Sequence, residues 1–164
     1  MVTVNSRLAA EKFSSQPDKA RIFIALSELY RHILDNPGKK GLKIGFNPVT
    51  DKFIVLSDQH KGTRDGSDDF AVAEKNYCAA LEHYNQQGFT YINLGDGEEL
   101  WENTLSAVKK HNAQTFEKEA LFASQGRFIK IFGNHDLYWG NDPFAAGQLK
   151  NIYKQEVAIY EGLV

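Results

Sequence analysis

Three short polar strings in this chain each follow directly on an apolar run. They begin at Asp58, Asp96 and Asn134, and successive strings are 38 residues apart. That spacing suits a strand, a crossover helix and the next strand of a parallel sheet. The carboxyl ends of parallel neighbours lie at one edge of a sheet, which is where open α/β sheets bind ligands. We therefore expect the three strings to bring their side chains together in one site.

The first two strings supply carboxylates and an imidazole. Asp58 and His60 are two positions apart, so in extended geometry both side chains point to one side and can reach one metal ion. A capping Asp followed by a surface His is the alternative for this pair. Asp96 lies between two glycines, which permit a close backbone approach, and its two oxygens can bridge two cations. The spacing of Glu99 favours a supporting role.

The third string, residues 133–136, is the most specific of the three. Asn134 offers an amide oxygen to a metal, His135 can donate a proton to a leaving oxygen, and Asp136 can hold the imidazole in orientation. A strand-end turn is the alternative for this string alone, because Asn and Gly are turn formers. Oxygen and nitrogen donors without a thiolate suit Mn²⁺, Fe²⁺ or Zn²⁺.

The elements that must position these strings follow from the apolar pattern. Continuous apolar runs indicate strands that are buried on both faces of a parallel sheet, and three-four spacing indicates helices. The predicted strands are residues 42–46, 52–57, 89–94, 127–132 and 156–160. The predicted helices are residues 18–35, 68–87, 98–111, 113–124 and 142–153. This order predicts an α/β fold with a mostly parallel sheet, right-handed crossovers and flanking helices.

The chain has the length and composition of one folded domain. It has 164 residues, of which 42% are hydrophobic and 24% charged, as in an ordinary globular protein with a core. The polar residues 1–16 are predicted to be a flexible N-terminal segment, and residues 17–164 the folded domain. The single cysteine, Cys78, lies in a predicted helix and is interpreted as a small core residue rather than a nucleophile.

Charge and hydropathy argue against two classes of partner. The net charge is −2, so no global basic field attracts nucleic acid. No stretch approaches the roughly 20 apolar residues of a membrane span, and the N-terminus has no apolar core of signal-peptide length. One thiol cannot form an internal disulfide, so the fold needs no oxidising compartment. We expect a soluble, cytoplasmic protein.

Taken together, the strings resemble the first three motifs of the calcineurin-like metallophosphoesterases. The matching residues are Asp58-x-His60, Gly95-Asp96-x-x-Glu99 and Gly133-Asn134-His135-Asp136. The resemblance covers about residues 50–140. The longer string at residues 95–102 also resembles, loosely, the bacterial branch that includes the UDP-diacylglucosamine pyrophosphatases.

The resemblance implies a metal-dependent hydrolase that cleaves a phosphomonoester or phosphodiester through a metal-bridging hydroxide. It places Asp58, His60 and Asp96 on one divalent ion and Asp96 with Asn134 on a second. It assigns His135 to phosphoryl transfer. The family fold is a four-layer α/β/β/α sandwich with its metals at the carboxyl ends of the strands.

The chain departs from the family pattern in two ways. The second motif ends in Glu99 where Asp is more usual, and it lacks the Asp-Arg pair of the protein serine/threonine phosphatases, which argues against that group. The family completes its site with further histidines downstream, whereas only 28 residues follow Asp136 and none is His. The resemblance therefore implies that residues 17–164 are the N-terminal half of the sandwich, truncated on the C-terminal side.

Two functions stay open at this point. The first is a phosphoesterase acting on a phosphate-ester substrate. The alternative is a catalytically incomplete fragment, or a non-enzymatic metal-binding or interaction module. We expect residues 61–69 and 97–112 to form pocket walls. Lys61 and Arg64 can bind a substrate phosphate there, with ordinary surface charge as the alternative.

Overall fold

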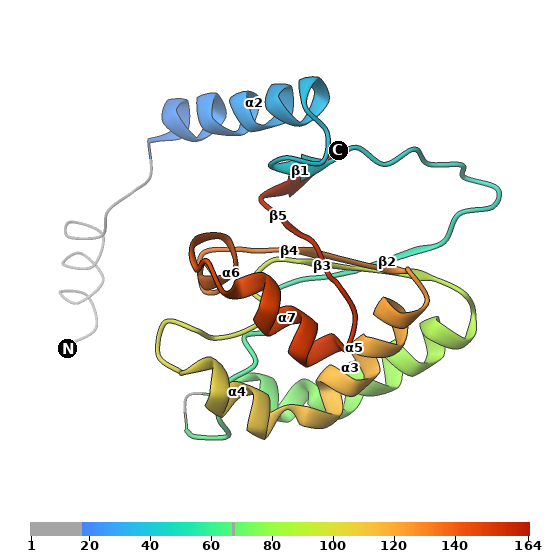
Figure 1. Ribbon diagram of the computed structural model, residues 1–164, viewed down its shortest axis with the longest axis vertical. Coiled ribbons are helices and arrows are strands. Elements are labelled where there is room, and N and C mark those ends of the chain that lie inside the picture. Colours follow the sequence, from blue (N-terminus) through green and yellow to red (C-terminus); the bar gives the residue numbers. More distant parts are fainter. Residues whose placement is uncertain (1–17, 67) are drawn as a thin grey trace, which may run out of the picture.

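A four-stranded parallel sheet forms the centre of the molecule (Figure 1). The computed structural model describes residues 18–66 and 68–164, so the flexible segment predicted at residues 1–16 lies outside the described residues. The strands lie in the order β2 (Phe53–Leu56), β3 (Thr90–Leu94), β4 (Phe128–Ile131) and β5 (Ile159–Tyr160). Each neighbouring pair is parallel. The predicted α/β class with a parallel sheet is confirmed.

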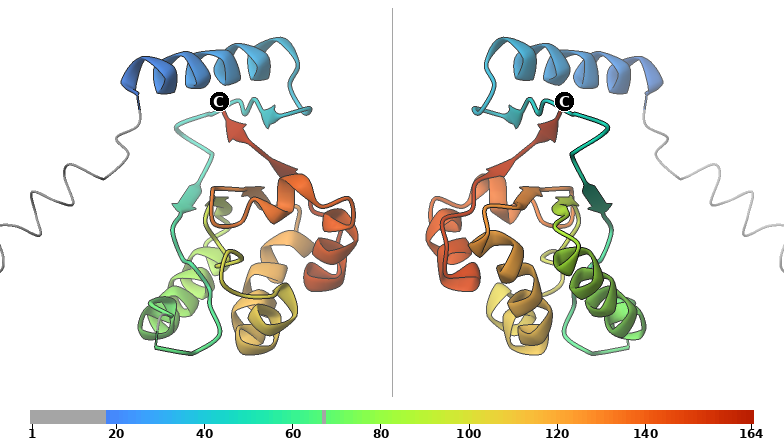
Figure 2. Two further views of the ribbon diagram at one scale, coloured as in Figure 1. Left: turned by 90° about the vertical axis from the view of Figure 1, so that its left-hand side faces the viewer. Right: turned by 90° about the vertical axis from the view of Figure 1, so that its right-hand side faces the viewer.

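Helices flank this sheet, as predicted. The helices of the described residues are α2 (Lys19–Asp35), α3 (Phe70–Gln86), α4 (Leu105–His111), α5 (Ala113–Ser124), α6 (Tyr138–Asn141) and α7 (Ala145–Tyr153). Helices α3 and α5 cover one face of the sheet, and α7 packs beside α5 (Figure 1). Helix α2 lies on the other side of the sheet, next to a short parallel pair (Figure 2). That pair is β1 (Gly41–Leu42) and β6 (Gly162–Leu163). The four-layer sandwich stays a prediction.

The strands form at the apolar runs, because these side chains can be buried on both faces of the sheet. The buried backbone N–H and C=O groups are then paired with the neighbouring strands. On the face that meets the helices, Tyr91 of β3 pairs in register with Phe128 of β4, and their rings stack with centroids 5.2 Å apart. Tyr91 also meets Phe122 of α5 with ring centroids 5.5 Å apart. This packing fixes the helical layer against the strands that carry the polar strings.

One predicted helix begins later than expected. The prediction for residues 98–111 is wrong over its first turns, since α4 starts only at Leu105 after Thr104, whose hydroxyl accepts the Ala107 N–H. The backbone before α4 forms hydrogen bonds outside the helix, since the Glu99 N–H donates to the Lys61 carbonyl at 3.1 Å. Residues 98–103 therefore form a loop that reaches towards the end of β2.

The other boundaries differ by smaller amounts. Helix α7 begins at Ala145 rather than at residue 142, because the Asp142 carboxylate accepts the Phe144 N–H in a turn. The strand predicted at residues 42–46 shares only Leu42 with β1, and the strand predicted at residues 156–160 is reduced to β5. Helix α6 was not predicted from the pattern.

Two polar side chains interrupt the apolar face under the helices. Asn93 of β3 and Lys130 of β4 are in register, two positions beyond Tyr91 and Phe128, so they point to the same side. Both are fully buried. Burial of a charged side chain requires a partner of opposite charge, and that partner comes from the loop just described.

Candidate metal centre

The loops after β2 and β3 turn sharply at the residues that were predicted to bind metal. Asp58, His60 and Asp96 all have left-handed backbone, with φ of 56°, 49° and 51°. Such a conformation costs a non-glycine residue on the order of 1 kcal/mol and persists only where neighbouring contacts enforce it. The extended geometry predicted for Asp58 and His60 is therefore wrong. The turn still brings them together, with His60 Nε2 3.9 Å from Asp58 Oδ1.

Backbone hydrogen bonds hold these two loops side by side. The His60 N–H donates to the Asp96 carbonyl at 2.9 Å, and the Asp58 N–H donates to the Gly95 carbonyl at 3.2 Å. The third loop joins them through the Asp96 side chain, because Oδ1 accepts the His135 backbone N–H at 2.7 Å. The three strand-end strings therefore meet at one edge of the sheet, as their spacing predicts.

The donor atoms of Asp58, His60 and Asp96 all lie within 4.8 Å of one another. Two carboxylates and one imidazole are the donor chemistry of a hard or borderline divalent ion, so this set fits a metal such as Mn²⁺, Fe²⁺ or Zn²⁺. Asn134 is exposed at the same edge. Within the described residues its side chain makes no hydrogen bond, so its amide is available as a further donor.

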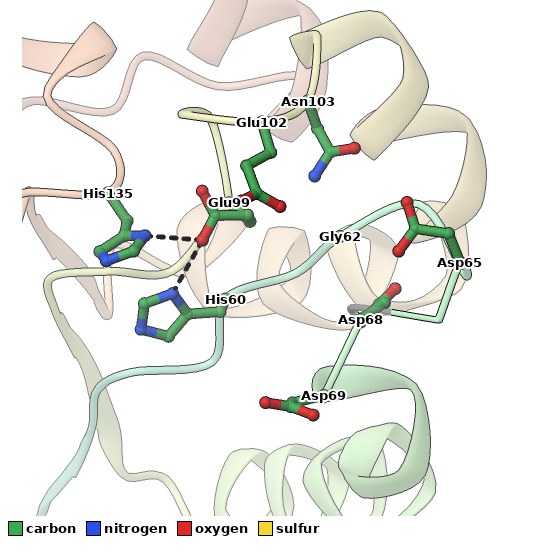
Figure 3. A pocket seen from close by; sticks show the side chains of 9 residues that line it. All are labelled: His60, Gly62, Asp65, Asp68, Asp69, Glu99, Glu102, Asn103 and His135. Carbon is green, nitrogen blue, oxygen red and sulfur yellow. Dashed lines mark hydrogen bonds and ion pairs between the residues drawn. The ribbon is translucent and has the colours of Figure 1, made fainter. Parts of the chain in front are cut away.

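Glu99 organises the two histidines (Figure 3). Its Oε2 meets Nδ1 of His135 at 2.6 Å and Nδ1 of His60 at 3.2 Å. The two rings lie edge to face with centroids 4.3 Å apart. Burial alone would raise the pKa of Glu99, but the hydrogen bonds with His60 and His135 outweigh burial and lower that pKa. An ionised Glu99 can only accept hydrogen bonds, so this arrangement directs Nδ1 of each ring to Glu99 and leaves each Nε2 for other contacts.

Asp136 has a different role from the one predicted for it. The His135 ring contacts Glu99, and the Asp136 carboxylate instead accepts the backbone N–H groups of Gly133 at 2.6 Å and Gly97 at 2.9 Å. Asp136 is fully buried. It fixes the second loop to the third and is not in contact with the imidazole it was expected to orient.

A fully buried charge network lies directly beneath the loops. Lys61 Nζ lies 3.1 Å from Glu98 and 2.7 Å from Glu119, while Lys130 Nζ lies 2.8 Å from Glu98. All four side chains have no exposed surface. Three aromatic side chains give these carboxylates further hydrogen bonds. Tyr77 and Tyr153 donate to Glu119, and Trp139 donates to Glu98.

The phosphate-binding role suggested for two basic residues does not fit their surroundings. Lys61 is buried inside the network, where its ammonium group is fully paired. Arg64 pairs with Glu74 at 2.6 Å and also donates to the His111 carbonyl at 3.1 Å. Neither cation is among the residues that line the cavity.

Acid should weaken this network through Glu98. Burial alone would raise its pKa, but the charges of Lys130 and Lys61 outweigh burial and lower it from 4.5 to about 2. The stabilisation is therefore complete above pH 4.5 and is lost as the pH falls through about 2. The shift corresponds to roughly 3 kcal/mol. We expect the advantage of the native chain over Glu98→Gln in urea unfolding to shrink by about that amount between about pH 6 and about pH 2. An advantage that does not vary with pH would contradict this assignment.

An acidic cavity of about 330 Å³ opens beside the histidines (Figure 3). Seven of its nine lining residues come from the two segments expected to form pocket walls, residues 61–69 and 97–112, and the other two are His60 and His135. The lining residues are His60, Gly62, Asp65, Asp68, Asp69, Glu99, Glu102, Asn103 and His135. Because the described lining has five carboxylates and no lysine or arginine, its field attracts cations and repels a bare phosphate.

An exposed tryptophan lies at the rim of the site. The Trp101 indole is 62% exposed and stacks on the His135 ring, with centroids 4.1 Å apart and planes 23° apart. Its backbone N–H donates to Glu99 Oε1 at 3.1 Å. The His135 imidazole is thus held by Glu99 at one nitrogen and by the indole on one face.

Comparison with models of protein families, with curated proteins and with solved structures finds no match for this chain. In residues 18–66 and 68–164, no helix combines the length and apolar character needed to cross a membrane. The interpretation of the site therefore depends on its own geometry.

The buried network is the feature that the sequence pattern missed. A signal for it was present, because Asn93 and Lys130 interrupt two otherwise apolar strands at equivalent positions. A polar residue in the middle of a buried strand requires a buried partner. The partner of Lys130 is Glu98, which lies in a loop, where acidic residues are usually solvated. The Asn93 amide donates to Gln59 Oε1 and to the Tyr91 hydroxyl, both at 3.0 Å.

Proposed function

We propose that this chain carries the metal-binding part of a phosphoesterase site of the calcineurin-like metallophosphoesterase kind. The observation that supports this most strongly is the set of donors on Asp58, His60 and Asp96, which lie within 4.8 Å at the carboxyl edge of a parallel sheet. The substrate is a phosphomonoester or a phosphodiester. A cytoplasmic site of action belongs to the same proposal, because the fold contains one buried thiol, Cys78, and uses no disulfide.

The metal ligands in this proposal are Asp58, His60, Asp96 and Asn134. They would hold two divalent ions, Mn²⁺, Fe²⁺ or Zn²⁺, with Asp96 shared between the ions. Ions held there would supply Lewis acidity, which lowers the pKa of a bound water and offsets negative charge on phosphoryl oxygens. The need for ions agrees with the acidic lining of the cavity, since no described lysine or arginine lines it to receive a phosphate.

His135, when both of its ring nitrogens carry a proton, is the proposed proton donor to the leaving oxygen. Its Nδ1 is held by Glu99 at 2.6 Å, which leaves Nε2 as the atom that can face a substrate. Its backbone N–H donates to Asp96, which ties the main chain at His135 to the proposed bridging carboxylate. Asp136 contributes by fixing Gly97 and Gly133, the glycines around which these two loops approach one another.

One observation favours a second candidate function, metal binding without turnover. The described residues provide two overlapping groups of close donors, Asp58, His60 and Asp96 and His60, Glu99 and His135, and the described lining of the cavity has no lysine or arginine that would orient a substrate phosphate. A chain of this kind binds metal and contacts a partner without hydrolysing an ester. Turnover measured together with metal content separates the two functions.

The test is hydrolysis of an aryl phosphomonoester and a bis-aryl phosphodiester in the presence of Mn²⁺. We expect Asp96→Asn combined with His135→Ala to reduce turnover by about 10³-fold or more, since it removes a shared ligand and the proton donor. The matched control is Asp35→Asn with His111→Ala, the same two changes at exposed positions, which should leave the rate unchanged.

Two outcomes would decide against hydrolysis. Turnover that survives the paired change at Asp96 and His135 would refute the mechanism. Stoichiometric Mn²⁺ binding to Asp58, His60 and Asp96, shown by its loss in Asp96→Asn, with no turnover of either ester, would support the binding module instead.

A further inference from the structure

The residues that face the cavity alternate with residues that point into the protein. His60 is followed by the buried Lys61, and Glu99 is preceded by the buried Glu98. Lys61 and Glu98 also pair as a parallel β-bridge, with the Lys61 N–H donating to the Gly97 carbonyl at 3.1 Å and the Glu99 N–H donating to the Lys61 carbonyl at 3.1 Å. A shift of the buried residue therefore moves its cavity-facing neighbour.

One buried carboxylate contacts parts of all three loop regions. Glu98 belongs to the second loop. It pairs with Lys61 of the first loop at 3.1 Å and with Lys130, in the strand that leads into the third loop, at 2.8 Å. It also accepts the Trp139 indole N–H at 2.6 Å, from the helix that follows the third loop. No other carboxylate among the described residues forms ion pairs with both of these lysines.

Stability alone does not explain this arrangement. Buried ion pairs are commonly replaced by apolar residues of similar volume with little or no loss of stability, because desolvation offsets the attraction. Apolar contacts do not constrain the relative orientation of the groups they join, whereas charge-assisted hydrogen bonds fix both distance and angle. The benefit expected from Glu98 is therefore a defined relative position of the groups it joins.

We propose that Glu98 is a positioning residue of the metal centre, whose bonds to Lys61, Lys130 and Trp139 set the register of the three loops. The inference rests on the proposed function for what the loops hold. The order of the loops is measurable without any metal, so the two ideas can fail separately.

The test is the double change Glu98→Met with Lys130→Met. It removes one charge of each sign and leaves Lys61 paired with Glu119, so the remaining network stays neutral. We expect hydrogen exchange at the Lys61 and Glu99 amides to speed up by about tenfold or more, relative to amides of α5, which serve as the reference for global unfolding. We expect the Kd for Mn²⁺ to rise by about 10–100-fold, as when groups that orient metal ligands are removed.

A matched control acts on the far end of the same network. Tyr153→Phe removes the hydroxyl that donates to Glu119 at 2.9 Å and leaves every bond of Glu98 intact. We expect it to lower the Tm by about 2–4 °C, with relative exchange at Lys61 and Glu99 and the Kd for Mn²⁺ unchanged. If the network had only a structural role, the Glu98 and Lys130 double change would also lower stability and leave relative exchange and the Kd for Mn²⁺ unchanged, as Tyr153→Phe does.

The proposal is overturned if the double variant folds with wild-type relative exchange at the Lys61 and Glu99 amides. Should the double variant not fold, Glu98→Gln decides by the same measurement, because it keeps the length of the side chain and weakens its bonds to both lysines. Wild-type relative exchange in Glu98→Gln would then overturn it. If the native chain binds no Mn²⁺, the proposed function fails, and the exchange comparison still decides the role of Glu98.

Discussion

Replacing Gly133 with alanine should strongly weaken the proposed binding of metal at Asp96. A Cβ at position 133 would lie 2.3 Å from Asp96 Oδ1 and 2.8 Å from the Asp96 backbone nitrogen, closer than any real contact. The proposed shared ligand would have to move, and the bond from the His135 N–H to Oδ1 would be lost with it. We expect calorimetric titration to show the Kd for Mn²⁺ weakened by about 100-fold or more.

The matched control for this change is Gly147→Ala in α7. A Cβ there meets nothing within 4 Å, so alanine should stabilise the helix by about 0.5–1 kcal/mol and leave Mn²⁺ affinity unchanged. Overpacking at position 133 is expected to cost about 1–3 kcal/mol of stability, which is small enough for the affinity of folded protein to be measured. Wild-type affinity in Gly133→Ala would mean that Asp96 does not hold the metal.

Lys61→Met should be the most destabilising single substitution in the network. It leaves Lys130 as the one lysine of the network to neutralise two buried carboxylates, Glu98 and Glu119, at a site with no exposed surface. Breaking a buried ion pair on one side typically costs about 3–5 kcal/mol, because the remaining charge loses its partner and cannot reach water. Urea unfolding followed by circular dichroism measures this loss.

Lys118→Met is the control for the loss of a lysine. Lys118 pairs with Glu82 at 3.1 Å on the surface between α3 and α5, where the two side chains are 24% and 58% exposed. Such exposed pairs contribute less than about 1 kcal/mol. If Lys61→Met cost no more than Lys118→Met, Lys61 would have to be solvated, and the phosphate-binding role first suggested for it would return.

Local sequence signals were sufficient for the sheet. The apolar runs ending before Asp58, Asp96 and Asn134 predicted three parallel neighbours, and β2, β3 and β4 have that order and direction. Such signals are reliable because burial on both faces imposes a continuous apolar run, and the crossover needs a minimum length of chain. The same reasoning brought Asp58, His60 and Asp96 to one edge.

The details of the site depended on contacts that local patterns do not report. Asp136, next to His135 in sequence, was the natural partner for its ring, yet Glu99 takes that place from another loop. The extended geometry assumed for Asp58 and His60 gave the correct grouping for an incorrect reason, because both residues have left-handed backbone. Loop conformation is set by cross-loop hydrogen bonds, and these join residues about 40 positions apart in the chain.

The sequence by itself determined the α/β class, the parallel order of the strands and the edge at which the polar strings meet, since these follow from apolar periodicity and spacing. Only the tertiary structure decided that Lys61 is buried and that Glu98 joins it to Lys130. A lysine in a glycine-containing loop is normally solvated. Whether it can be buried depends on carboxylates that folding brings within about 3 Å, and Glu119 is 58 residues away in the chain.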